Sequence, residues 1–128
     1  MYALENVLSV LIDFPDLPYD NNRLSSSDTN MYYSDYNVQH YQQLQFSTTG
    51  YTGPSGQNLM SAYQYYQQES GGTFTFAGTT YGWVTADNNA AFYGENDPDN
   101  NDNDKNATAL IAEAVQKAVT ENSINLSD

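Results

Sequence analysis

Hydrophobic residues recur along this chain with two different periods, and the change of period separates predicted strands from predicted helices. Residues 6–14, NVLSVLIDF, form a short apolar run that is followed by the breakers Pro15 and Pro18. A run of this length is too short for a buried helix and is typical of a strand buried on both faces. We therefore expect a central strand here, followed by a long surface loop over residues 15–30.

A short helix is predicted over residues 37–46, NVQHYQQLQF. Asn37 can accept a free N–H group of the first helical turn. Three apolar side chains then fall near one face, namely Val38, Tyr41 and Leu44. Residues 47–56 contain glycines and Pro54, which predict turns throughout.

A second helix is predicted where Ser61 and Gln64 have the spacing of a capping box. Leu59, Tyr63 and Tyr66 fall on one side of it. Gly71 and Gly72 end it in the manner of a C-terminal cap.

After these glycines the period becomes alternating, because Phe74 and Phe76 fall on one face of an extended chain. Aromatic and β-branched residues favour strands. Gly78 interrupts the pattern before Tyr81 and Trp83 continue it. We therefore predict a strand, a turn at Gly78 and a second strand.

The last third of the chain combines an acidic stretch with a strongly patterned helix. Residues 86–104 predict an Asn-rich acidic loop anchored by Phe92 and Tyr93. The helix that follows has an apolar stripe at helical spacing, made of Ala107, Leu110, Ile111, Ala114, Val115, Ala118 and Val119. Glu113 and Lys117 form an i,i+4 pair on it in the favourable order.

Acidic residues also lie before this helix, and a strand pattern follows it. Asp102 and Asp104 fall at the positive N-terminal end of the helix dipole. Residues 124–126 begin a further strand pattern just before residue 128. Together these elements predict a mixed α/β fold with about three helices.

Length and charge narrow the class of protein. The chain has 128 residues, which suits one small domain, and a formal net charge of −13. So acidic a chain repels phosphate backbones and anionic membrane surfaces, which argues against nucleic-acid partners. It has no cysteine, no apolar window long enough to span a membrane and no signal-peptide pattern at its N-terminus. We therefore expect no membrane insertion.

The sequence lacks the residue patterns of a zinc site, a catalytic serine and a phosphate-binding glycine loop. His40 is the only histidine, whereas a zinc site needs three or four well-placed ligands. No serine lies in a G-x-S-x-G elbow, and no glycine loop is followed by Lys-Ser or Lys-Thr. The sequence therefore predicts no independent active site.

Four acidic residues before the last helix are the candidates for a metal site, namely Asp97, Asp99, Asp102 and Asp104. Calcium takes oxygen ligands at such alternating positions. An EF-hand does not fit, because Ala107 stands where its turn glycine is required and the helical pattern runs through the loop. Two interpretations stay open, a calcium site of another kind and a solvated loop that caps the helix.

The aromatic residues also have two interpretations. Tyr63, Tyr66, Phe74 and Phe76 have the spacing that packs a helix on a sheet, which favours a core. Three others are less constrained and are candidates for substrate binding, namely Tyr65, Tyr81 and Trp83. One hypothesis for function is therefore a stand-alone acidic binding module for carbohydrate or peptide.

The order of motifs resembles the start of the peptidase domain in the immune inhibitor A family of secreted bacterial zinc metallopeptidases. The specific pieces are the Asp-Phe-Pro-Asp end of the first strand, the Tyr-Tyr helix leading into Ser-Gly-Gly, and Tyr-Gly-Trp-Val. The similarity extends from about Asn6 to Asp128.

This resemblance implies a zincin-type catalytic domain, of which residues 1–128 would be a single or partial domain carrying the twisted mixed sheet of the upper subdomain. It also implies a secreted enzyme that acts on protein or peptide substrates. Its zinc lies on a His-Glu-x-x-His helix, which this sequence does not contain, so we expect no catalytic residue and no bound zinc in this segment. The family also binds calcium, which keeps the four aspartates as candidates.

Overall fold

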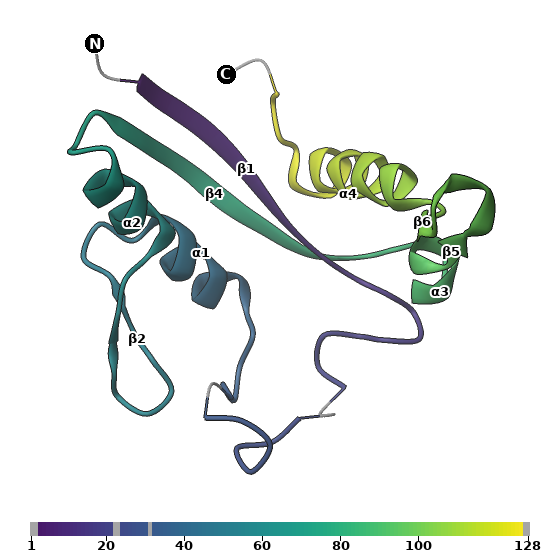
Figure 1. The fold of residues 1–128 in the computed structure, drawn as a ribbon, viewed down its shortest axis with the longest axis horizontal. Coiled ribbons are helices and arrows are strands. Elements are labelled where there is room, and N and C mark those ends of the chain that lie inside the picture. The colour runs from purple at the N-terminus through teal and green to yellow at the C-terminus, as the bar shows by residue number, and fades with distance from the viewer. Residues whose placement is uncertain (1–2, 22–23, 31, 127–128) are drawn as a thin grey trace. The chain divides into compact units, whose positions relative to one another are not determined.

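The computed structural model describes residues 3–21, 24–30 and 32–126 (Figure 1). The chain divides into two compact units. The first unit consists of Met1–Ser9 and Asn22–Thr80, and the second unit of Val10–Asn21 and Tyr81–Asp128. The helices and strands in both units confirm a mixed α/β fold.

The main sheet pairs β1 (Ala3–Asp13) with β4 (Phe74–Thr85). The predicted first strand is present and begins earlier than expected. Its predicted position as a central strand is wrong for the described residues, because β4 is its only neighbour in the described sheet. Its predicted burial on both faces is also wrong there, since Val7 is 38% exposed, whereas Leu11 is buried.

The two strands approach each other closely at glycines. The Val7 carbonyl oxygen lies against Gly78, and the Leu11 carbonyl oxygen lies against Gly82. Contacts therefore advance in the same direction along both strands, so β1 and β4 run parallel. A parallel connection of this kind requires a crossover of many residues, which here contains the helices of the first unit.

The predicted turn at Gly78 is wrong, since β4 runs without a break from Phe74 to Thr85. A Cβ atom at Gly78 would stand only 2.2 Å from the Val7 carbonyl oxygen and 2.6 Å from the Phe46 ring. The missing side chain thus permits a close approach of strand and helix rather than a change of direction.

Helix α1 (Val38–Phe46) lies in the first unit and begins as the sequence predicts. The Asn37 side chain accepts the His40 N–H at 2.9 Å, which satisfies one free donor of the first turn. The helix is anchored to β4 by Gln42. Its Nε2 donates to the Gly78 carbonyl at 3.0 Å, and its Oε1 accepts the Thr80 N–H at 2.7 Å.

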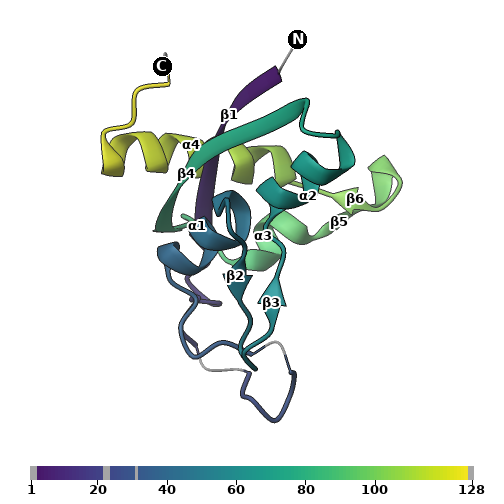
Figure 2. The same ribbon diagram turned by 90° about the vertical axis from the view of Figure 1, so that its left-hand side faces the viewer.

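Helix α2 (Ala62–Glu69) contacts α1 and has the predicted capping box (Figures 1 and 2). The Ser61 hydroxyl accepts the Gln64 N–H at 3.1 Å, and the Gln64 side chain accepts the Ser61 N–H at 3.2 Å. Gly71 and Gly72 follow with φ of 62° and 80° and end the helix as expected.

The first unit also contains a small hairpin, visible in Figure 2, which the sequence pattern did not predict. Strand β2 (Tyr51–Thr52) pairs antiparallel with β3 (Asn58–Leu59). These residues fall in or beside the segment predicted as turns only. Strands of two residues show no alternation, so their pairing cannot be recognised from periodicity.

An aromatic cluster forms the centre of the first unit. Phe76 is only 8% exposed and contacts the rings of Phe46, Tyr63 and Tyr66 at centroid distances of 5.7, 6.4 and 5.6 Å. The predicted packing of the second helix against the strand is therefore confirmed.

In the second unit, residues predicted as a loop are largely structured. They form α3 (Ala90–Gly94), β5 (Asn96–Asp97), a 3₁₀ turn η1 (Pro98–Asn100) and β6 (Asn103–Asp104). Strands β5 and β6 pair antiparallel. Of the two predicted aromatic anchors, Tyr93 is buried and Phe92 is 47% exposed.

The last helix is confirmed as α4 (Ala107–Asn122). Of its predicted apolar stripe, Ala114 and Ala118 are buried, whereas Ile111 is 66% exposed. The strand predicted at residues 124–126 is wrong, because these described residues form no strand, and residues 127–128 lie outside the described part. Among the described helices, none has the length and apolar character needed to cross a membrane.

Candidate functional site

The Asp-Phe-Pro-Asp motif forms a turn at the end of β1. Asp13 is 7% exposed, and its Oδ2 accepts the Tyr19 N–H at 3.1 Å. Asp16 Oδ1 accepts the Ala90 N–H at 2.9 Å at the start of α3. Both aspartates therefore hold backbone amides in place, which gives the motif a structural role within the second unit.

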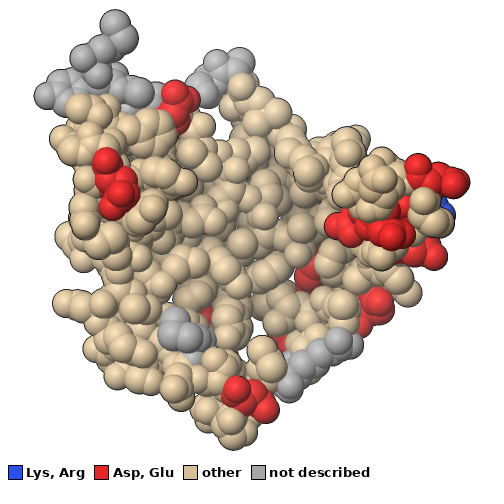
Figure 3. Space-filling model, viewed as in Figure 1, with Lys and Arg blue, Asp and Glu red and all other residues tan. Residues whose placement is uncertain are grey.

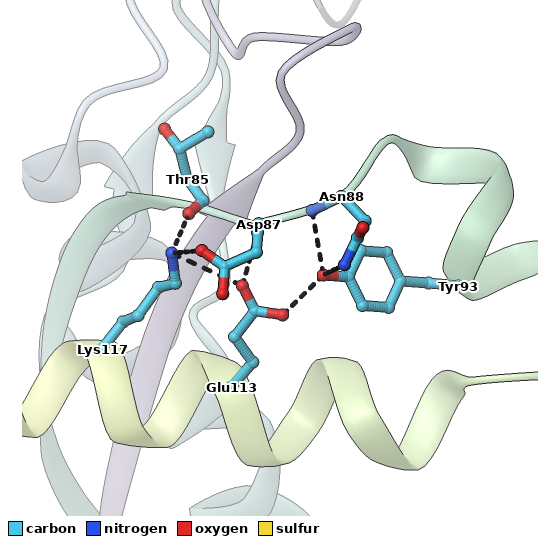
Figure 4. A network of polar contacts seen from close by, with 6 residues as sticks. All are labelled: Thr85, Asp87, Asn88, Tyr93, Glu113 and Lys117. Atoms are coloured by element: carbon cyan, nitrogen blue, oxygen red, sulfur yellow. Dashed lines mark hydrogen bonds and ion pairs between the residues drawn. The ribbon is translucent and has the colours of Figure 1, made fainter.

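A polar network surrounds Glu113 of α4 (Figure 4). Its Oε2 accepts the Tyr93 hydroxyl at 2.5 Å, and its Oε1 accepts the Asp87 N–H at 2.5 Å. The Asn88 N–H donates to the Tyr93 hydroxyl oxygen at 3.3 Å. The predicted pair with Lys117 is confirmed at 3.4 Å.

Lys117 completes this network. Its Nζ donates to the Thr85 carbonyl and to Asp87 Oδ1, both at 2.7 Å. The hydrogen bond to Asp87 is the main reason that the pKa of Lys117 is raised, and Glu113 adds to it. Both oxygens of Glu113 accept hydrogen bonds from other residues of the protein, so the network joins α4 to the segment after β4.

His40 is surrounded by tyrosine rings rather than by metal ligands. The rings of Tyr33, Tyr36 and Tyr41 stand edge-on to it at centroid distances of 4.1, 5.6 and 4.8 Å. Burial lowers the pKa of His40, and Asp35 opposes this shift. In the part of the chain that the structure describes, no three His, Asp or Glu side chains are grouped to hold a metal. These residues do not fit a catalytic zinc ion.

The four candidate calcium ligands lie in the β5–β6 hairpin, over which acidic side chains gather in Figure 3. Asp97 faces Asn103 across the hairpin, and its side chain accepts the Asp99 N–H at 3.0 Å. Asp102 has a φ of 58°. The hairpin brings Asp97, Asp99, Asp102 and Asp104 into one short segment. Calcium binding there stays a prediction, without a described cluster of three acidic side chains to support it.

The three candidate binding aromatics have different surroundings. Tyr65, in the first unit, is 52% exposed and contacts Tyr66 edge-on. Trp83, in the second unit, stacks on Tyr19 with ring centroids 4.7 Å apart and an interplanar angle of 3°. Tyr81 is half-buried. A role of these residues in carbohydrate or peptide binding stays a prediction.

Comparisons with known proteins agree on one family. The family model for the catalytic domain of immune inhibitor A peptidase M6 matches residues 2–128. Pre-pro-metalloprotease PrtV of Vibrio cholerae serotype O1 is 49% identical over 124 residues, which cover 97% of this chain. Immune inhibitor A of Bacillus thuringiensis subsp. alesti is 29% identical over 117 residues, or 90% of this chain.

These relatives are much longer than the chain. The match covers 13% of the length of the Vibrio protein and 17% of the Bacillus protein. The family match nevertheless covers nearly all of the sequence described above, including its Asp-Phe-Pro-Asp and Tyr-Gly-Trp-Val motifs. The chain therefore belongs to the immune inhibitor A family of M6 peptidases, and it is a segment of the family's catalytic domain.

Proposed function

We propose that residues 1–128 are the scaffold part of the catalytic domain of a secreted zinc-dependent peptidase. The observation that carries this proposal is the match of residues 2–128 to the M6 catalytic domain. The name of the Vibrio relative, a metalloprotease, supports metal-dependent hydrolysis of proteins or peptides. In metallopeptidases of this chemistry, histidines hold zinc and a glutamate activates the bound water.

The residues of this segment do not supply that site. Three protein ligands are the usual minimum for catalytic zinc, and this sequence has His40 as its one histidine. Its ring is packed among tyrosines, and no described acidic group completes a ligand set around it. The ligands of the whole enzyme therefore come from residues outside positions 1–128, while β1, β4, α1, α2 and α4 provide framework.

The assignment of the zinc ligands to residues outside positions 1–128 can be tested directly. The test compares the 128-residue chain with the longest polypeptide that its gene encodes. We expect the 128-residue chain to bind no stoichiometric zinc and to leave casein intact. The longer polypeptide, after any activation step, should contain one zinc ion per chain and hydrolyse casein in a chelator-sensitive manner. Tight stoichiometric zinc together with proteolysis by residues 1–128 alone would overturn the proposal.

A further inference from the structure

The first unit contains an open, mainly apolar pocket beside β1, β4, α1 and α2, to which α1 contributes Gln45. Its volume is about 490 Å³, which lies within the range of pockets that bind small ligands or side chains. Its apolar lining consists of Val7, Ala62, Tyr66, Phe74 and Phe76.

Three aromatic rings that contact one another line this pocket. The Tyr66 ring stands edge-on to Phe74 at 5.7 Å and to Phe76 at 5.6 Å. Phe76 is 8% exposed and forms part of the buried cluster, whereas Tyr66 is 48% exposed. The pocket thus has a buried aromatic base and an accessible aromatic rim.

The described charged residues of the first unit, which contains this pocket, are acidic. Glu5 is the charged residue of the lining, and it is exposed. The described part of the first unit contains no Lys or Arg side chain, and its carboxylates are Glu5, Asp28, Asp35 and Glu69. A cationic ligand is therefore favoured. A second copy of this chain is disfavoured, because each copy has a net charge of −13.

We propose that this pocket binds the side chain of an arginine presented by a peptide segment. The aliphatic stem of arginine packs on apolar surface while its guanidinium stays at the rim. The guanidinium stacks on aromatic faces and pairs with carboxylates. In this pocket Tyr66 provides the aromatic face and Glu5 provides the carboxylate. This inference does not depend on the peptidase activity of the whole enzyme.

Two small probes distinguish the contribution of the guanidinium group to binding from that of the apolar contact. N-acetyl-arginine methylamide and N-acetyl-norleucine methylamide share an aliphatic stem and differ in the guanidinium. In an NMR titration of the protein, the arginine probe should shift the signals of Tyr66, Phe74 and Phe76. It should half-saturate them at a concentration about twofold to fivefold lower than the norleucine probe, as an exposed ion pair allows.

Matched variants assign this difference to Glu5. Glu5→Gln should reduce the difference between the two probes to the part that stacking on Tyr66 provides, whereas Glu69→Gln removes a charge that does not line the pocket and should preserve the full difference. Ala62→Phe should fill the pocket and weaken both probes. If Ala62→Phe no longer shows the dispersed amide spectrum of a folded protein, the comparison of Glu5→Gln with Glu69→Gln still tests the proposal.

Equal binding of both probes to the unmodified protein would overturn the proposal and leave a neutral apolar pocket. The same conclusion follows if Glu69→Gln and Glu5→Gln reduce arginine binding alike, because the effect would then be one of general charge. Signal shifts confined to residues outside the pocket would also overturn it.

Discussion

Glu113 shows how one side chain can organise a region of polar backbone. Its two oxygens accept hydrogen bonds from the Tyr93 hydroxyl and the Asp87 amide, and Lys117 lies beside it. Tyr93 is 2% exposed, so a polar partner lost at this position cannot readily be replaced by water. Buried polar groups that lose their partners are costly to the folded state.

The substitution Tyr93→Phe should therefore destabilise the protein. It leaves the ring in place, removes the donor to Glu113 and removes the acceptor of the Asn88 N–H. We expect the free energy of unfolding to fall by about 1–3 kcal/mol in urea denaturation. Tyr65→Phe, at a 52% exposed ring, is the matched control and should change it little. Equal effects of the two substitutions would contradict a structural role for the network.

His40 should make stability depend on pH. Burial lowers its pKa in the folded state, while Asp35 opposes the shift and Tyr33, Tyr36 and Tyr41 surround the ring. The unfolded chain then binds a proton more readily than the folded one. The stabilisation is fully present above the unfolded pKa of about 6.5 and is lost as the pH falls below it.

Urea denaturation of the protein and of His40→Gln at about pH 5 and about pH 8 measures this contribution on either side of the unfolded pKa. The difference in unfolding free energy between the two proteins should be smaller at the lower pH. A difference that does not change with pH, or one that grows on acidification, would show that folding does not lower the pKa of His40.

The same residues show which contacts a sequence can disclose. Glu113 and Lys117 are four positions apart on one helix face, so their pairing follows from helical geometry alone. Asp87 and Tyr93 are 26 and 20 positions from Glu113. Their contacts depend on how β4, α3 and α4 pack, which no local pattern encodes. The stacking of Tyr19 on Trp83 was missed for the same reason.

At the scale of elements, local signals predicted the helices well and the strands incompletely. Asn37 and Ser61 cap α1 and α2 through contacts three residues away, which are visible in the sequence. The two-residue strands of the β2–β3 and β5–β6 hairpins exist through pairing and carry no period of their own. Gly78 was predicted as a break because the close approach of Val7 and Phe46 was not visible.

Gly78→Ala tests the role of this close approach. The added Cβ would meet the Val7 carbonyl oxygen at 2.2 Å, and backbone cannot move aside as a flexible side chain can. We expect a loss of about 1–3 kcal/mol in unfolding free energy, as for other overpacked sites. Gly94→Ala is the matched control, because a Cβ there has no neighbour within 4 Å. Gly78→Ala with the stability of this control would show that the strands separate easily at this point.

At the scale of the whole molecule, charge is the dominant feature. The net charge of −13 arises from 16 acidic and 3 basic residues, and self-repulsion of this kind weakens the compact state. Four of these acidic residues lie in one short segment, the β5–β6 hairpin, namely Asp97, Asp99, Asp102 and Asp104. Screening and specific calcium binding would both stabilise such a protein, and they can be distinguished.

Thermal unfolding in NaCl and CaCl₂ at equal ionic strength makes this distinction. NaCl should raise the midpoint by screening. If the hairpin binds calcium as the sequence predicts, CaCl₂ should raise it further, and Asp99→Asn with Asp102→Asn should remove the additional increase. Glu69→Gln, which lies outside the hairpin, should retain it. Equal midpoints in the two salts would contradict the calcium prediction.

Gln42 also bears on solubility. An open strand edge offers its amides and carbonyls to any extended chain, which is how sheets nucleate fibrils. The Gln42 amide occupies the Gly78 carbonyl and the Thr80 N–H and so imitates a neighbouring strand. Gln42→Ala should therefore increase thioflavin-positive aggregation more than Gln68→Ala on an exposed face of α2, and equal aggregation would refute this role. One amide side chain would then take the place on the β4 backbone that a foreign strand could otherwise occupy.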